Sequence, residues 1–334
     1  MTTRVAINGF GRVGRAAFRA AFESGADVEW VGINDIADVG ALGNVLARDS
    51  VYGAFPAVIG TGDGAIFVDG VEVPVFAEAD PAKLPWGELG VDVVLECTGR
   101  FRTRADAAGH LAAGARKVIV SAPMKDADAT VVLGVNFPAV YDPDVHAVIS
   151  NASCTTNCLA PVAKVLHETV GIRHGLMTTI HAYTGDQRLV DTPHEDPRRA
   201  RAAGVNLVPT STGAAKALGL VIPELAGRLQ GFAVRVPIPT GSIVDLTVET
   251  ERATSVEEIN TLFREHASDI LAYSDAPIVS SDIVKSPYSA IFDAPLTTVI
   301  DGTQVKVIAW YDNEWGYSTR LVELAQQVLV PALV

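Results

Sequence analysis

Three glycines, spaced as Gly9-x-Gly11-x-x-Gly14, directly follow a strand-like segment at residues 3–8 in the sequence INGFGRVGR. The residues after Gly14 have the apolar spacing of an amphipathic helix. Glycines here permit a tight turn and bring the backbone close to a pyrophosphate, which the N–H groups and positive end of the helix can bind. The pattern predicts a strand–loop–helix unit that binds a dinucleotide, and it restricts the start of the chain to an α/β fold.

A second buried strand, residues 27–35, ends in Asp35. Asp35 lies about 20 residues beyond the glycines, where dinucleotide-binding units carry an acidic residue that hydrogen-bonds the adenosine ribose. A carboxylate at this position repels the 2′-phosphate of NADP, so NAD is the expected cofactor. The alternative is that Asp35 is only a turn residue after a strand.

Strand-like and helix-like segments keep alternating through the first half of the chain. The further strand-like runs lie at 91–99, 117–123 and 146–153, and a helical pattern covers 104–115. Residues 51–76 differ, because turn signals at Gly60–Gly64 and Asp69–Gly70 indicate a β-hairpin insert. The order predicts a Rossmann-type doubly wound parallel sheet, an NAD-binding domain over residues 1–153.

The pattern changes at Cys154. The segments after it are a helix at about 154–169, an arginine-rich loop at 185–210, strands within 231–250 and 304–313, and an amphipathic helix at 255–268. This order predicts an α+β catalytic domain over residues 154–317 with a mostly antiparallel sheet. The final helix, 318–334, is expected to pack back on the first domain.

Composition excludes several classes of protein. The 334 residues suffice for two domains, and 26 basic against 39 acidic residues give a net charge of -13, which disfavours nucleic-acid binding. No apolar run reaches the ~18 residues of a membrane span. Three cysteines are too few for a disulfide framework, and the start MTTRVAINGF carries no apolar signal segment, so a cytoplasmic protein is expected.

Two cysteines lie one helical turn apart in SNASCTTNCLAP, residues 150–161. Cys154 is at the predicted helix start, with Asn151 or Ser153 as the cap, and the free N–H groups there stabilise a thiolate. Cys158 falls inside the helix and is expected to pack as a small buried residue. A disulfide across one turn would be strained, and zinc lacks further ligands at suitable spacing, so no metal site is predicted.

A reactive thiol needs a partner that handles protons. Of the 7 histidines, His181 ends a strand where a polar loop begins, which is a usual place for a catalytic side chain. A histidine with a purely structural role is the alternative.

Six segments together resemble one family. They are INGFGRVGR, SNASCTTNCLAP, TTIHAYTGDQ, PTSTGAAKALG, RVPIPTGSIVDL and WYDNEWGYS, in order from Val5 to the final helix. The chain is identified by them as similar to the phosphorylating glyceraldehyde-3-phosphate dehydrogenases of glycolysis. The resemblance implies that Cys154, as a thiolate held in an ion pair with His181, attacks the aldehyde of glyceraldehyde 3-phosphate. His181 then takes the hydroxyl proton as hydride leaves for NAD. Inorganic phosphate then attacks the thioester to release 1,3-bisphosphoglycerate.

The resemblance also implies binding residues and an assembly. For NAD they are Gly9, Gly11, Arg12, Val13, Gly14, Asp35, Ser121 and Asn313. One phosphate site uses Thr184, Asp186 and Arg235, the other Ser153, Thr155, Thr212 and Gly213, with Arg199 as a further contact. The expected assembly is a homotetramer, with the loop 185–205 crossing a subunit interface.

Some positions depart from the family pattern. Tyr52 stands where many members have histidine, and Pro197 replaces a common leucine. Thr192 precedes Pro193 in a loop that helps to set cofactor preference, and the proline favours NAD. Three alternative functions are an erythrose-4-phosphate dehydrogenase with poor phosphorolysis, a non-catalytic NAD-binding protein, and a redox switch through Cys154 and Cys158.

Overall fold

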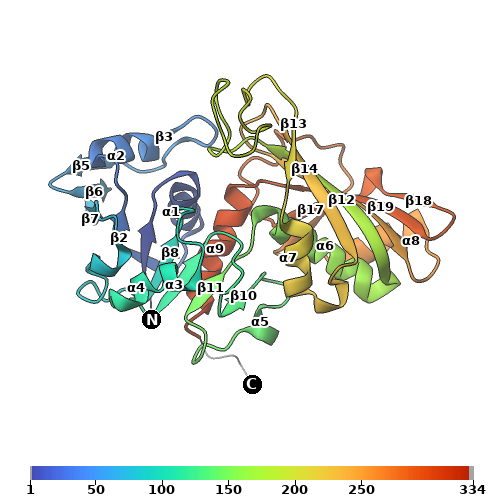
Figure 1. Ribbon diagram of the computed structural model, residues 1–334, viewed down its shortest axis with the longest axis horizontal. Coiled ribbons are helices and arrows are strands. Elements are labelled where there is room, and N and C mark those ends of the chain that lie inside the picture. Colours follow the sequence, from blue (N-terminus) through green and yellow to red (C-terminus); the bar gives the residue numbers. More distant parts are fainter. Residues whose placement is uncertain (1, 331–334) are drawn as a thin grey trace. The chain divides into compact units, whose positions relative to one another are not determined.

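The computed structural model describes residues 2–330 (Figure 1). They form two compact units, and the chain passes from the first to the second and back. The first unit contains residues 2–131, 137–152 and 318–330, and the second contains 132–136 and 153–317. Among residues 2–330, none of the helices has both the length and the apolar run that crossing a membrane would take.

The first unit is built on a nine-stranded sheet with the order β10-β11-β9-β8-β1-β2-β7-β6-β5. The central strands are β1 (Thr3–Asn8), β2 (Val28–Asn34), β7 (Val71–Phe76), β8 (Val93–Glu96), β9 (Lys117–Val120), β10 (Ala129–Thr130) and β11 (Val148–Ser150), all parallel to their neighbours in this group. Because the strand order reverses on either side of β1, a ligand crevice is expected at the carboxyl ends of β1 and β8.

The predicted hairpin insert is a meander at one edge of this sheet. Strands β5 (Ile59–Gly62), β6 (Ala65–Val68) and β7 pair antiparallel through turns at Asp63–Gly64 and Asp69–Gly70. β7 also pairs with β2 in parallel, so the insert extends the main sheet. The small pair β3 (Arg48–Asp49) and β4 (Gly53–Ala54) follows α2 (Val39–Ala47).

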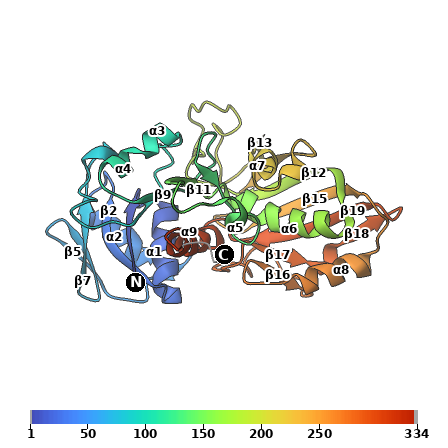
Figure 2. The same ribbon diagram turned by 90° about the horizontal axis from the view of Figure 1, so that it is seen from below.

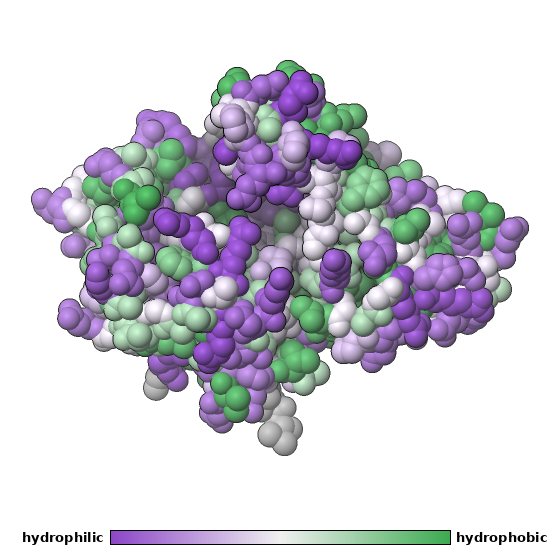
Figure 3. All heavy atoms as spheres, in the orientation of Figure 1, coloured by the Kyte–Doolittle hydropathy of each residue, from purple (hydrophilic) through white to green (hydrophobic). Residues whose placement is uncertain are grey.

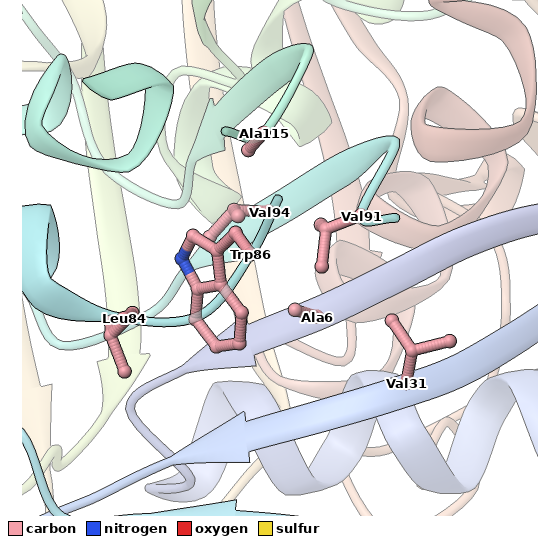
Figure 4. Packing of buried hydrophobic residues seen from close by; sticks show 7 residues of the cluster. All are labelled: Ala6, Val31, Leu84, Trp86, Val91, Val94 and Ala115. Carbon is pink, nitrogen blue, oxygen red and sulfur yellow. The ribbon is translucent and has the colours of Figure 1, made fainter. Parts of the chain in front are cut away.

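Apolar residues from several strands of this sheet contribute to the hydrophobic core of the first unit. Figure 4 shows one cluster, in which Trp86 is fully buried beside Ala6 of β1, Val31 of β2 and Val94 of β8. β8 and the carboxyl-terminal parts of β1 and β2 are buried on both faces, which explains the apolar runs in these parts of the sequence.

Four helices of the first unit bear on the predictions. α1 (Arg12–Ser24) begins inside the glycine loop. α9 (Trp315–Gln327) lies beside α1 (Figures 1 and 2), with the Ser318 hydroxyl 3.3 Å from the Val13 carbonyl oxygen. The final helix, predicted at 318–334, begins at Trp315 and ends at Gln327. Residues 331–334 of the predicted range lie outside the described residues. The segment 104–115 is divided into α3 (Arg104–Ala107) and α4 (Gly109–Ala112) rather than forming one helix.

The second unit contains an eight-stranded mixed sheet with the order β13-β14-β12-β15-β19-β17-β16, to which β18 adds by pairing with β19. The strands are β12 (Ile172–Ala182), β13 (Val208–Ser211), β14 (Leu229–Val236), β15 (Ser242–Thr250), β16 (Leu271–Ser274), β17 (Ala290–Asp293), β18 (Thr298–Ile300) and β19 (Gln304–Tyr311). Only the β12–β14 and β16–β17 pairs of this path are parallel, so the sheet is mostly antiparallel.

Three helices cover one face of this sheet (Figure 2). α6 (Cys154–Val170) packs on β12, β15, β17 and β19, and it lies between α7 (Ala214–Val221) and α8 (Val256–Glu265). Pro161 stands inside α6, where its missing N–H leaves one helical hydrogen bond unmade. The carboxyl end of β12 and the first turn of α6 supply the residues of the candidate site.

Candidate active site

A cavity of about 230 Å³ lies at the carboxyl ends of the central strands of the first unit. It is lined by the segments that leave β1, β2, β7 and β8, among them Gly9, Gly11, Asp35 and Thr98. This is the crevice that the strand order predicts. Three of the predicted cofactor residues, the two glycines and Asp35, are thus brought together.

The glycine loop fits a pyrophosphate. Gly9 has a φ of +92°, and a Cβ on it would lie 2.6 Å from the Thr98 nitrogen. A Cβ on Gly14 would lie 2.3 Å from the Gly9 carbonyl oxygen, whereas the Cα of Gly11 faces open space. Side chains are therefore excluded where the backbone is crowded, and the start of α1 is open to a ligand.

Asp35 is tied to the glycine loop. Its Oδ2 accepts a hydrogen bond from the Phe10 N–H (2.8 Å), and its Oδ1 accepts one from the Ala37 N–H (3.0 Å). These bonds fix the carboxylate at the cavity wall. Asp35 thus fills the role of a turn residue and is also placed where it can meet a ribose.

Three other predicted cofactor residues of the first unit, Arg12, Val13 and Ser121, are neighbours in sequence or hydrogen-bond partners of residues that line the cavity. Arg12 opens α1, its guanidinium pairs with Asp49, and it lies 5.4 Å from the centre of the Tyr52 ring. Val13 follows it in the first turn. Ser121, after β9, hydrogen-bonds the thiol of Cys97, a residue of the cavity wall. Tyr52, which replaces a common histidine, therefore helps to hold Arg12.

Cys154 is the first residue of α6. Ser153 is the N-cap, and its Oγ accepts a hydrogen bond from the Thr156 N–H at 3.1 Å. Cys154 is half-buried, whereas Cys158, one turn later, is fully buried with its sulfur 3.9 Å from the Ala309 carbonyl oxygen. The thiol of Cys154 is therefore accessible at the start of the helix, whereas that of Cys158 is packed in the core.

His181 faces this thiol from the end of β12. Its Nε2 lies 3.4 Å from Cys154 Sγ. Its Nδ1 lies 2.7 Å from the Ala182 carbonyl oxygen and 2.7 Å from Arg235 Nη1. The parallel register of β12 and β14 pairs His181 with Arg235, so the sheet itself places the guanidinium beside the imidazole.

Burial and charge set the protonation of this group. Burial raises the pKa of Cys154, while Arg235, the Thr155 hydroxyl and helix N–H groups lower it in part. Burial and the Arg235 charge lower the pKa of His181 to about 3. Both shifts favour a thiol next to a neutral imidazole rather than the thiolate–imidazolium pair that the resemblance implies. Arg235 can only donate, whereas Nε2 accepts a proton from sulfur in the tautomer whose Nδ1–H donates to the Ala182 carbonyl.

Three residues that the sequence prediction missed support the site. The Tyr311 hydroxyl lies 2.9 Å from both Thr155 Oγ1 and Thr179 Oγ1, and its ring meets His181 edge-on. Ser242 accepts a hydrogen bond from the Ala182 N–H and donates one to Asn313 Oδ1, so it links the end of β12 to the predicted nicotinamide ligand. The alternation along β12, which puts Thr179 and His181 on one face, was an available signal for the threonine.

The predicted phosphate ligands are arranged around two arginines. Asp186 pairs with Arg199 at 2.6 Å, and Arg199 also donates to Thr210 Oγ1 at 2.9 Å. The arginine oriented by Asp186 is therefore Arg199. Arg235 lies instead beside His181 and donates to the Ala182 carbonyl. Thr184 comes two residues before Asp186, at the start of the loop after β12.

The second predicted group is divided between two helix starts. Thr212 and Gly213 precede α7, Thr212 Oγ1 accepts from the Ala214 N–H, and Gly213 opens onto free space. Ser153 and Thr155 lie at the start of α6, where Thr155 is buried and bonded to Tyr311. Helix starts with free N–H groups are favourable for anions. Among residues 2–330, no cluster of three His, Cys, Asp or Glu side chains could hold a metal ion.

Comparisons with known proteins match both halves of the chain to one enzyme family. The NAD binding domain of glyceraldehyde 3-phosphate dehydrogenase matches residues 3–104, and the C-terminal domain of the same enzyme matches residues 153–313. The chain is similar to glyceraldehyde-3-phosphate dehydrogenase 1 of Streptomyces avermitilis, with 59% identity over 97% of this chain and 98% of the relative. It is also similar to the glyceraldehyde-3-phosphate dehydrogenases of Mycobacterium bovis (59%, over 98% and 99%) and Geobacillus stearothermophilus (54%, over 98% of each).

Proposed function

Since the chain belongs to the glyceraldehyde-3-phosphate dehydrogenase family, we propose that it catalyses the NAD-dependent, phosphorylating oxidation of D-glyceraldehyde 3-phosphate to 1,3-bisphosphoglycerate. Each of its two units performs a different part of this reaction. The domain of residues 1–153, with the helix after residue 318, binds NAD. The domain of residues 154–317 carries the thiol chemistry. The observation that supports this division most strongly is the 3.4 Å approach of His181 Nε2 to Cys154 Sγ at the start of a 17-residue helix.

Cys154 is the nucleophile in this proposal. His181 Nε2 takes the thiol proton, and the sulfur attacks the aldehyde carbon, so that a C–S bond forms and the carbonyl oxygen becomes an alkoxide. The Cys154 N–H and protonated His181 stabilise this oxygen, and the imidazolium returns its proton to it. The product is a neutral hemithioacetal on Cys154.

His181 then acts as the general base for oxidation. Bound NAD supplies the acceptor for the hydride that leaves the former aldehyde carbon. His181 Nε2 takes the hydroxyl proton as the carbonyl re-forms, which gives a thioester on Cys154. An oxygen of inorganic phosphate attacks that carbonyl, the C–S bond breaks, and the phosphate proton is released to solvent. The sulfur leaves as a thiolate and takes the proton back from His181, which restores the starting thiol and neutral imidazole. Asn313, held by Ser242, orients the nicotinamide carboxamide.

Two anion sites hold the substrate phosphate and inorganic phosphate. Thr184, Asp186 and Arg235 serve one of them, with Asp186 acting through Arg199. Ser153, Thr155, Thr212 and Gly213 serve the other through hydroxyls and helix N–H groups. Local donors of this kind offset the unfavourable field of a chain with net charge -13.

The assembly is a cytoplasmic homotetramer. The three cysteines are free thiols, as expected in a reducing compartment. The loop between β12 and β13 carries apolar side chains that are more than half exposed, at Leu189, Val190, Val205 and Leu207. Figure 3 shows hydrophobic atoms at the tip of this loop, and Leu176 and Phe232 are exposed on the sheet face that the helices leave uncovered. Such surfaces are typical of subunit interfaces.

Steady-state kinetics with NAD and with NADP, each with and without inorganic phosphate, tests the function. We expect NAD reduction that depends on glyceraldehyde 3-phosphate and is accelerated by phosphate. Mass spectrometry of the acylated protein identifies the nucleophile. A faster rate with erythrose 4-phosphate and no phosphate dependence would favour the erythrose-4-phosphate enzyme instead. Full activity in Cys154→Ser, with NAD still bound, would contradict the assigned nucleophile.

A further inference from the structure

A buried carboxyl group is hydrogen-bonded to residues that line the NAD cavity. Glu96, the last residue of β8, is 1% exposed. Its Oε2 accepts from Asn8 Nδ2 (2.5 Å) and lies 3.1 Å from His110 Nε2. Its Oε1 accepts from the Thr98 N–H (2.8 Å) and from the Thr98 hydroxyl. Four donors thus converge on one side chain that the catalytic chemistry does not use.

The hydrogen bonds indicate which partners of Glu96 donate. Trp86 Nε1 lies 3.0 Å from His110 Nδ1, and indole nitrogen can only donate, so Nδ1 carries no proton. The proton of the neutral imidazole is then on Nε2, which donates to Glu96. All four partners of Glu96 can donate to a carboxylate, and none of them is a lysine or arginine.

The bonds continue across the ends of four parallel strands. Asn8 of β1 accepts through Oδ1 from Asn34 Nδ2 of β2 (2.6 Å). Asn34 in turn bonds the backbone of Glu78, just after β7, through both atoms of its amide. Glu96 therefore ties β8 to β1 and, through the two asparagines, to β2 and the segment after β7.

The same bonds shape the loop after β8. Thr98 Oγ1 donates to Glu96 and accepts from the Arg100 N–H at 3.1 Å. The Phe101 ring meets His110 edge-on, with ring centres 6.3 Å apart. Half of the residues that line the NAD cavity belong to this network or are held by it: Asn8, Asn34, Glu78, Thr98, Arg100 and Phe101.

We propose that Glu96 is a positioning residue for NAD, because its carboxylate sets the spacing of the cavity walls before the cofactor binds. The proposal rests on the assigned role of the first unit as the NAD-binding domain. A buried carboxylate without a cationic partner costs free energy, and its four donors offset that cost only if they keep this geometry. Glu96 touches none of the reacting atoms, and it acts through Asn8, Thr98 and His110.

Glu96→Gln tests the proposal in the full-length enzyme. A glutamine has one acceptor oxygen, so its NH2 group must face two donors. We expect the KM for NAD to rise about tenfold or more, while kcat at saturating NAD stays within about threefold of wild type. Trp86→Phe is the control, since it removes a donor from His110 but leaves the hydrogen bonds from Asn8 and Thr98 to Glu96 in place. It should lower the melting temperature and leave the KM for NAD within about twofold.

Thr98→Val and Thr98→Ser are a second pair of variants, which test the role of Glu96 if Glu96→Gln does not fold. The valine removes the hydroxyl that links Glu96 to Arg100 and should raise the KM for NAD about threefold or more, whereas the serine should restore it. A wild-type KM for NAD in Glu96→Gln, or equal KM values for the valine and serine variants, would overturn the proposal. If wild-type protein itself failed to reduce NAD with glyceraldehyde 3-phosphate, the proposed function would fail instead.

Discussion

Arg235 Nη1 lies 2.7 Å from His181 Nδ1, because the register of β12 and β14 places the two residues side by side. A guanidinium at this distance opposes protonation of the imidazole, and burial acts in the same direction. The same charge favours the thiolate of Cys154. One arginine thus acts on both partners of the proposed catalytic pair.

Alkylation of Cys154 by iodoacetamide should accelerate as the pH rises through the alkaline range. Burial raises the pKa of Cys154, so the reactive thiolate is a minority species at neutral pH and increases with pH. The pKa of His181 is lowered to about 3, so the imidazole is neutral throughout this range and adds no second transition to the pH profile of the alkylation rate. Rate constants measured by mass spectrometry check this. A constant rate from about pH 6 to pH 8 would instead indicate a thiolate–imidazolium pair.

Arg235→Gln should move this alkylation profile to higher pH. Without the positive charge the thiolate is less stable, and we expect the rate near pH 8 to fall about threefold to tenfold. Arg198→Gln removes the same charge from an exposed position and is the matched control. Identical profiles for the two variants would show that Arg235 does not act on Cys154.

Cys158→Ala should leave kcat within a few-fold of wild type. The side chain is fully buried and its thiol lies 3.9 Å from the Ala309 carbonyl oxygen, so the change should cost about 1–2 kcal/mol of stability by leaving a small cavity. Cys154→Ala should abolish turnover at unchanged stability. Parallel assays and melting curves separate the two effects, and loss of activity in Cys158→Ala would refute the division of roles.

Asp35→Ala should relax the discrimination against NADP. Removing the carboxylate removes its repulsion of the 2′-phosphate, so the KM for NADP should fall about tenfold. Asp38→Ala is the control, because Asp38 caps α2 three residues later and is exposed. Steady-state kinetics with both cofactors provides the measurement. If Asp35→Ala keeps the wild-type selectivity for NAD over NADP, Asp35 acts only as a turn residue.

Asp128→Asn should destabilise the first unit at neutral pH but not in acid. Burial alone would raise the pKa of Asp128, but Arg104 and the N–H groups of Val148 and Ala147 outweigh it and lower that pKa. The stabilisation is present above the unfolded pKa and is lost as the pH falls through the lower, folded pKa. Melting curves should show that the variant is about 1–3 kcal/mol less stable than wild type at pH 7, and that this difference becomes smaller below about pH 4. An equal loss of stability in Asp126→Asn would argue against a specific role for Asp128.

Local patterns in the sequence were sufficient for much of this molecule. The glycine loop, the strand before it and the α/β fold class are confirmed, and NAD as the cofactor is confirmed as well. These features depend on neighbours within a few residues or on the alternation of strands and helices. The start of α6 at Cys154 is of the same kind, because Ser153 caps the helix locally.

Long-range pairing explains what the sequence could not show. The pairing of His181 with Arg235 depends on the register of two strands separated by the whole β13–α7 segment. The predicted single helix over 104–115 is interrupted at Ala108, and the second piece carries His110 to Glu96 and Trp86. Helical spacing alone gives no sign of a buried partner elsewhere in the chain.

The return of the chain to the first unit after Tyr317 has a consequence for biosynthesis. A nascent chain that has emerged up to Tyr317 already holds every residue of the second unit, so the Cys154 site can form while translation continues. The first unit still lacks the part of α9 that lies beside α1, with Leu321 and Leu324 fully buried. The dinucleotide-binding half, although it is translated first, is therefore the last to be completed.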